Sequence, residues 1–149
     1  MRITKHTDYA LRVLLYLAVR SKQGAESEVV PTARIAEAFG ISENHLTKVA
    51  RRLSELGLVT SKRGVGGGLT LALEPTEVSV GAVMRAFDRA EDLIECFDEA
   101  TDECVISPAC GLKAVLGEAQ EAFFATLDPV TLAELVHRRR AALAKLLEL

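Results

Sequence analysis

The stretch that decides the fold is residues 32–57, TARIAEAFGISENHLTKVARRLSELG. It contains two runs of apolar residues at helical spacing, which predict two short helices. The inward-facing positions are Ile35, Ala36, Phe39, Leu46, Val49, Ala50 and Leu53. Thr32 and Ser42 are expected to cap the two helices, and Gly40 and Gly57 to end them. Two helices joined by a tight turn after Gly40 form a helix-turn-helix pattern.

Two β-prone runs follow, at residues 58–61 and 69–73, on either side of the glycine-rich residues 64–68. They predict a β-hairpin, which beside a helix-turn-helix is the wing of a winged helix. We therefore expect a mainly α-helical fold with a small β-hairpin wing. In this arrangement the second helix lies in the major groove of DNA. The glycines fit neither the Walker A pattern nor the dinucleotide fingerprint, which disfavours a nucleotide-binding loop.

The outward face of the second helix carries amide, imidazole, hydroxyl and cationic groups of the kinds that contact bases and phosphates. These residues are Asn44, His45, Thr47, Lys48, Arg51 and Arg52. Arg63 is placed for a phosphate or the minor groove, and Gly66 and Gly67 allow close backbone approach to DNA. We predict that all of these residues bind DNA; the alternative for each is an ordinary solvated face.

The charge distribution divides the chain into two parts. The net charge is −3, but residues 1–70 hold 11 Lys and Arg against 6 Asp and Glu, and residues 71–149 hold 7 against 15. This asymmetry is typical of a basic nucleic-acid-binding module joined to an acidic module with another function. We expect the winged helix to occupy residues 1–75 and a second region to occupy residues 76–149. Chance unevenness of a soluble surface is the alternative.

The second region is expected to be helical and to form a dimer. Helices are expected at residues 5–20 and 80–89, after Ser107-Pro108, and after Thr131 with its capping-box partner Glu134. The last two helices have more apolar surface than a small winged helix covers. A homodimer is the simple explanation, so the second region is interpreted as a dimerisation extension.

The only cysteines, Cys96, Cys104 and Cys110, lie within 15 residues of one another. Three thiols cannot all pair with one another. The N-terminus does not read as a secretory signal, and no apolar run reaches the roughly 18 residues of a membrane helix. We therefore expect a cytoplasmic protein without a membrane partner, in a compartment where disulfides are rare. Clustered thiols there favour a metal or an iron–sulfur cluster, with free structural cysteines as the alternative.

The spacing Cys-x7-Cys-x5-Cys differs from the Cys-x2-Cys of most structural zinc sites, so zinc is disfavoured. It also differs from the tight cysteine run of bacterial ferredoxins. Cys110 is expected in the first turn of the helix that begins at Pro108, where free N–H groups favour a thiolate. Three thiolates leave one iron of a cubane cluster without a protein ligand, so a fourth ligand must come from elsewhere.

Separate motifs along nearly the whole chain are shared with a known family. They include Thr7-Asp8-Tyr9-Ala10-Leu11-Arg12, Asn44-His45-Leu46-Thr47-Lys48-Val49, Arg63-Gly64-x-Gly66-Gly67-Gly68 and Cys104-Val105-Ile106-Ser107-Pro108-Ala109-Cys110. On these residues the chain resembles the Rrf-type family of winged-helix transcription regulators, and within that family the NsrR branch.

The resemblance implies a dimeric repressor that carries an iron–sulfur cluster, generally 4Fe-4S, and senses nitric oxide. It implies that Cys96, Cys104 and Cys110 are cluster ligands. It also implies that Asp8 of the partner subunit is the fourth ligand and that Arg12 lies beside the site. We therefore expect a regulator of operator DNA and not an enzyme.

Other classes stay open at this point. The nearest is an IscR-like 2Fe-2S sensor, or another iron or redox sensor, of the same family. A thiol redox enzyme is disfavoured because the chain has no Cys-x-x-Cys motif. A third alternative is a DNA-binding architectural or toxin–antitoxin protein without a cofactor.

Overall fold

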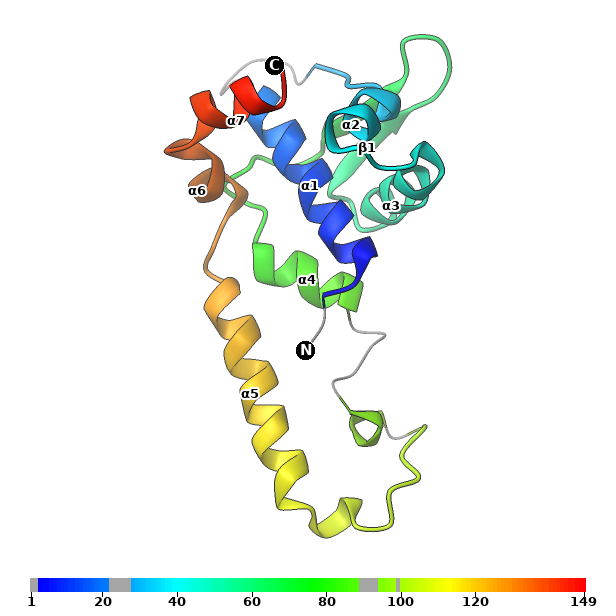
Figure 1. Ribbon diagram of the computed structural model, residues 1–149, viewed down its shortest axis with the longest axis vertical. Helices are drawn as coiled ribbons and strands as arrows, with labels where there is room; N and C mark the ends of the chain where they lie inside the picture. The colour runs from blue at the N-terminus through cyan, green and yellow to red at the C-terminus, as the bar shows by residue number, and fades with distance from the viewer. Residues whose placement is uncertain (1–2, 22–27, 89–93, 99) are drawn as a thin grey trace.

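The computed structural model describes residues 3–21, 28–88, 94–98 and 100–149. In chain order its elements are α1 (Lys5–Arg20), α2 (Thr32–Phe39), α3 (Glu43–Glu55), β1 (Val59–Lys62), β2 (Gly68–Leu71), α4 (Val80–Asp88), the 3₁₀ turns η1 (Glu95–Phe97) and η2 (Ser107–Ala109), α5 (Gly111–Leu127), α6 (Leu132–His137) and α7 (Arg140–Leu146). Figure 1 shows a head built from α1 to α4, the hairpin, α6 and α7, from which α5 extends. The mainly α-helical fold with a β-hairpin wing is confirmed.

Helix α1 lies at the centre of the head. Apolar residues occupy most faces of this helix, and Ala10, Val13 and Leu14 are completely buried. The helix contacts α2, α3, α4, α6, α7 and β2. The side chain of Thr4 caps its first turn by accepting a hydrogen bond from the backbone N–H of Thr7 at 3.1 Å. A helix that is apolar on nearly all sides is a core helix, which explains why the other elements surround it.

The helix-turn-helix forms as the apolar spacing predicts. Helix α2 ends at Gly40, whose φ of 61° is the left-handed conformation that closes a helix C-terminus. Ser42 occupies the N-cap position of α3, although its side chain makes no capping bond. The expected cap at Thr32 is wrong, because Pro31 holds the N-cap position. Val30 pairs with β2 through Leu69, which keeps the chain extended up to Pro31.

The wing is a two-stranded antiparallel hairpin. Its register pairs Val59 with Leu71 and Lys62 with Gly68. Gly66 at the tip has a φ of 73°, a conformation that other residues rarely adopt. Only Val59 and Leu69 of the hairpin are buried, so the wing is fastened to the head at one end and exposed at its tip.

The expected last helix is divided into α6 and α7. It begins as predicted, with the capping box of Thr131 and Glu134. It breaks after α6, and the guanidinium of Arg140 then donates to the carbonyl oxygens of Val19 at 2.6 Å and Ser21 at 2.7 Å. These carbonyls end α1, where a cation complements the helix dipole. This contact between the two ends of the chain holds α7 against the end of α1.

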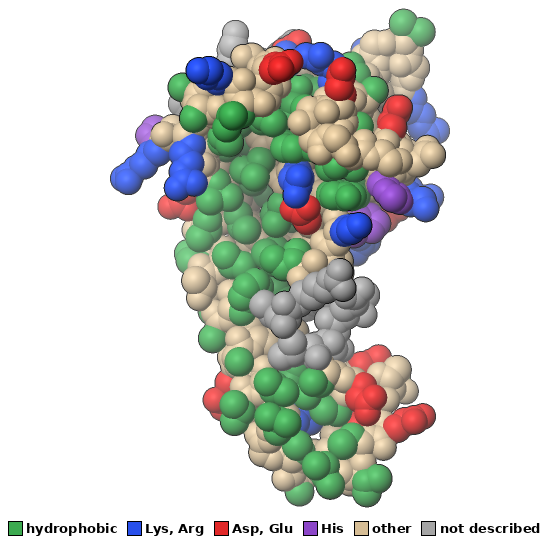
Figure 2. All heavy atoms as spheres, in the orientation of Figure 1, with side chains coloured by type: hydrophobic (Ala, Val, Ile, Leu, Met, Phe, Trp, Pro, Cys, Tyr) green, Lys and Arg blue, Asp and Glu red, His purple; other side chains and the backbone are tan. Residues whose placement is uncertain are grey.

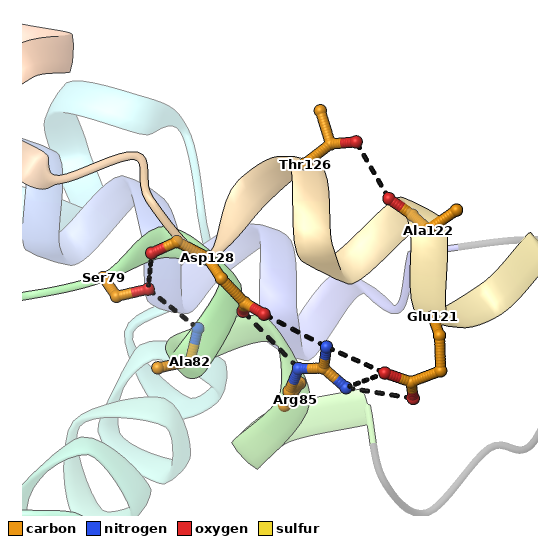
Figure 3. Close-up of polar contacts among 7 residues, drawn as sticks. All are labelled: Ser79, Ala82, Arg85, Glu121, Ala122, Thr126 and Asp128. Carbon is orange, nitrogen blue, oxygen red and sulfur yellow. Dashed lines mark hydrogen bonds and ion pairs between the residues drawn. The ribbon is translucent and has the colours of Figure 1, made fainter.

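The junction of α4 and α5 is fixed by polar contacts around Arg85 (Figure 3). Its guanidinium pairs with Glu121 and with Asp128, each at 3.1 Å, and lies 4.4 Å from the ring centroid of Phe124. The hydroxyl of Ser79 accepts from the N–H of Ala82 and donates to the carbonyl of Asp128 at 2.7 Å. The expected start of this helix at residue 80 is confirmed, and the hydroxyl of Ser79 that caps it also binds the end of α5.

Replacing Gly81 should separate these two helices. A Cβ at this buried position would lie 2.2 Å from Oδ1 and 2.5 Å from the backbone nitrogen of Asp128. We expect Gly81→Ala to destabilise the protein by about 1–3 kcal/mol, measured by urea unfolding at fixed protein concentration. Gly111→Ala is the control, because a Cβ there meets no atom within 4 Å. Equal urea midpoints for Gly81→Ala and the wild type would contradict the close packing of α4 on α5.

Candidate DNA interface and cysteine site

Helix α3 presents the predicted DNA-binding residues to solvent. The exposed positions are Asn44, His45, Thr47, Lys48, Arg51 and Arg52. The opposite face, through Leu46, Val49 and Leu53, is buried in the head. Figure 2 shows His, Lys and Arg side chains gathered on the side of the head that α3 forms. The predicted orientation of α3 is confirmed, whereas the DNA contacts of its residues stay predictions.

The exposed residues of α3 differ in their present partners. Arg51 and Arg52 both pair with Glu55, at 3.0 and 3.6 Å. The hydroxyl of Thr47 donates to the backbone carbonyl of Glu43 at 2.9 Å. Within the described part of the chain, the ammonium of Lys48 has no ion-pair partner. Lys48 is therefore available to a phosphate, while the two arginines share a carboxylate that DNA would have to compete with.

A groove of about 870 Å³ lies between α3 and the wing. It brings together the predicted residues Thr47, Arg51, Arg63 and Gly67. Gly66 lies beside them at the exposed tip of the hairpin. Sequence reasoning missed Lys62, which also lines the groove; its position next to Arg63 was the available signal.

The three cysteines are free thiols. The segment that carries them, from η1 to the start of α5, lies away from the head (Figure 1). Cys96 is buried in η1, whereas Cys104 and Cys110 are half-buried. The expectation that Cys110 lies in the first turn of a helix is wrong. Residues 107–109 form the 3₁₀ turn η2, and Cys110 is extended, with φ −80° and ψ 107°, at the N-cap position of α5. The N–H of Cys110 closes the 3₁₀ turn by donating to Ser107, so the α-helix starts one residue later.

A polar cluster holds the loop between Cys104 and Cys110. Asp102 accepts hydrogen bonds from the N–H of Cys104 at 3.1 Å, from the hydroxyl of Ser107, and from the ammonium of Lys113 at 3.2 Å. The Ser107 hydroxyl bond, with smaller contributions from Cys104 and Lys113, holds the pKa of Asp102 below its usual value. Sequence reasoning missed this cluster, because only the fold brings Lys113 to Asp102.

Asp8 lies in the first turn of α1 and forms an ion pair with Arg12. The two side chains meet twice, with Nη2 to Oδ2 at 2.8 Å and Nε to Oδ1 at 3.0 Å. Both are partly exposed, at 43% and 42%. Among the described residues, no three His, Cys, Asp or Glu side chains converge as a metal-binding group within one subunit. Completion of the cysteine site by Asp8 of the partner subunit stays a prediction.

Comparison with known proteins identifies the family. The family model described as "Rrf2: Iron-dependent Transcriptional regulator" matches residues 3–138. The chain belongs to the Rrf2 family. It is 44% identical over 149 residues to the HTH-type transcriptional regulator NsrR of Bacillus subtilis (strain 168), covering 100% of this chain and 99% of that protein. It is 43% identical to the HTH-type transcriptional repressor NsrR of Streptomyces coelicolor, covering 91% and 88%. The chain is therefore a transcriptional regulator with a helix-turn-helix.

Solved structures of this family share the fold. The structure of T. potens IscR superposes with a TM-score of 0.70 at 25% identity, covering 95% of this chain and 90% of that one. The oxidised form of Staphylococcus aureus CymR gives 0.68 at 27% identity, covering 91% and 95%. In the part of the chain that the structure describes, no helix is long and apolar enough to cross a bilayer.

Removing the Asp102 carboxylate should loosen the cysteine loop. We expect Asp102→Ala to increase the rate at which a maleimide alkylates Cys104 in the metal-free protein, measured by peptide mass spectrometry. The physical reason is the loss of the acceptor for the Cys104 N–H and the Ser107 hydroxyl. Glu103→Ala is the matched control, since Glu103 is an exposed acid of the same loop. Equal alkylation rates in the two variants would show that Asp102 does not order the loop.

Proposed function

We propose that this chain is a cytoplasmic, homodimeric repressor whose affinity for operator DNA is controlled by an iron–sulfur cluster that reacts with nitric oxide. The cluster is taken as 4Fe-4S, held by Cys96, Cys104 and Cys110 of one subunit and Asp8 of the partner subunit. The observation that carries the proposal is the set of three free thiols in a chain that matches regulators named NsrR over its full length.

The donor set suits such a cluster. Thiolates are the usual protein ligands of iron–sulfur clusters. Cys104 and Cys110 are half-buried and lie on a loop that Asp102 holds in place. The carboxylate of Asp8 is partly exposed on α1, where another subunit has access to it. When bound, the cluster would supply iron that takes up nitric oxide, most readily where the ligand is an oxygen and not a thiolate.

The segment outside the head, from η1 to α5, is called the extension from here on. Its exposed apolar side chains support a dimer. Val105 is 94% exposed, Ile106 65%, Leu112 64% and Val115 61%. Figure 2 shows hydrophobic side chains spread over this end of the molecule. Exposed apolar side chains gathered at one end of a molecule favour a protein interface, and a second copy of this chain is the simplest partner. A symmetric dimer would place two α3 helices in successive major grooves, about 34 Å apart.

Asp8 connects the two functions. It lies on α1, which packs directly against α3, whereas the cysteines lie on the extension. Ligation by Asp8 of the partner subunit would hold the extension of one subunit to the DNA-binding head of the other. Once released, Asp8 pairs with Arg12, as it does within this chain. Because coupling between two binding sites is reciprocal, bound operator DNA would then stabilise the cluster with Asp8 as its ligand.

One alternative has a specific observation in its favour. The similarity to T. potens IscR at a TM-score of 0.70 favours the IscR-like alternative, a regulator with a 2Fe-2S cluster. Anaerobic absorption spectroscopy and native mass spectrometry of the reconstituted protein distinguish the two cluster types. A 2Fe-2S mass that nitric oxide leaves unchanged would replace the proposed cluster and its signal.

Asp8→Ala should separate cluster control from folding. We expect nitric oxide to control release of the variant from DNA more weakly than release of the wild type, with the unfolding free energy changed by no more than about 0.5 kcal/mol. Release would be followed by fluorescence anisotropy on a duplex that the wild-type protein selects from a random library. Glu37→Ala is the matched control, because it removes another exposed helical ion pair of the head, with Arg34. Identical nitric oxide titrations for Asp8→Ala and the wild type would disprove ligation by Asp8.

Lys48→Ala should weaken DNA binding by removing a phosphate contact. We expect the slope of log K against log salt concentration to become shallower by about 1. Lys145→Ala, an exposed lysine of α7, is the control and should keep the slope of the wild type. An unchanged slope for Lys48→Ala would move this residue from the DNA interface to the ordinary solvated surface.

A further inference from the structure

A small cavity lies beside the proposed DNA face, between the start of α1 and the first half of α3. Its volume is about 280 Å³. Its lining residues are Lys5, His6, Tyr9, His45, Lys48 and Val49. Four of these residues carry basic nitrogen groups, and none carries a carboxylate. The surface of the cavity is largely apolar, and its cationic groups attract an anion.

The two lysines of this cavity are not neutralised by the protein. Arg12, Arg51 and Arg52 of the same two helices each pair with a carboxylate. In the described ranges of the chain, neither Lys5 nor Lys48 forms an ion pair. Asp8, the acid closest to Lys5 in sequence, is held by Arg12. The ammonium groups therefore keep their charge available for an external ligand.

The walls of the cavity are fixed by packing. Val49 is 1% exposed and belongs to the core of the head, and Tyr9 packs against that core. The ring of His6 contacts Phe87 of α4, with centroids 5.9 Å apart. The start of α1 is itself held by the Thr4 cap. Packing thus fixes one wall of the cavity, and the exposed basic side chains of α1 and α3 line the rest of it.

We propose that this cavity binds a backbone phosphate of the same DNA duplex whose major groove receives α3. Lys5 and His6 of α1 add to His45 and Lys48 of α3, so the DNA interface extends onto α1. The occupant is DNA because one wall is the exposed face of α3 itself, and the basic side chains continue along this side of the head (Figure 2). The inference rests on the proposed binding of DNA by α3, but it does not depend on the iron–sulfur cluster.

The location gives the contact a regulatory consequence. Lys5 and His6 lie in the same first turn of α1 as Asp8. A change of the partner that Asp8 binds would therefore occur within one helical turn of the residues proposed to contact a phosphate. The signal could reach DNA without any movement of α3 within the head.

The test uses a duplex of random sequence, because phosphate contacts do not require a specific operator. Binding of full-length Lys5→Ala, His6→Ala and Lys145→Ala proteins is measured by fluorescence anisotropy at several salt concentrations, with and without a reconstituted cluster. We expect Lys5→Ala to bind roughly 5- to 10-fold more weakly at 0.1 M salt, with a slope shallower by about 1. His6→Ala should bind more weakly in the same way, and Lys145→Ala should match the wild type.

Several controls keep the outcomes separate. Circular dichroism checks that each variant is folded, and Lys5→Arg should restore both the affinity and the slope. Lys5→Ala and His6→Ala proteins that bind like Lys145→Ala would overturn the proposal. Lys48→Ala is measured on the same duplex. If it weakened binding while Lys5→Ala and His6→Ala did not, DNA would contact α3 and no phosphate would occupy the cavity, which also overturns the proposal. A wild-type protein that binds DNA but takes up no cluster would disprove the proposed sensor function while this contact still stood.

Discussion

The burial of helix α1 is the constraint on which the rest of the molecule depends. Ala10, Val13 and Leu14 are inaccessible to solvent, and α3, α4 and α6 pack around them. Protein cores are closely packed and resist compression, so the packed elements hold fixed positions relative to α1. The recognition helix α3 inherits its orientation from this packing. Both ends of α1 stay accessible, and each end has a separate role.

The C-terminal end of α1 explains the part of the fold that the sequence did not predict. Its carbonyl groups need donors, and Arg140 supplies them from a point 121 residues away from Val19 in the chain. The apolar stripe of residues 132–147 predicts one helix, because periodicity reports only local order. The break between α6 and α7 follows from a contact between distant segments. The same limit hid the cluster of Asp102, Ser107 and Lys113, which the fold assembles around the cysteine loop.

Local signals did predict the DNA-binding head. The left-handed Gly40, the Ser42 cap position and the buried face through Leu46 are properties of short segments, and the structure contains all three. Only some of the candidate site residues could be predicted from the sequence. The cysteines and the face of α3 could be chosen from residue type and spacing. The contribution of Lys5 and His6 could not, because only packing brings the start of α1 next to His45 and Lys48.

The structure also restricts how a signal could travel from the cysteines to DNA. Within one subunit the extension joins the head at α4 and α5, where Arg85 binds two carboxylates and Gly81 leaves no room for a Cβ. The contacts of this junction hold one closely packed arrangement, and coupling between sites needs an element with two states. The accessible start of α1 has such an element, since Asp8 binds either Arg12 or, under the proposed function, a cluster of the other subunit. Control of DNA binding would therefore pass between subunits through the first turn of α1, and not along the extension of a single chain.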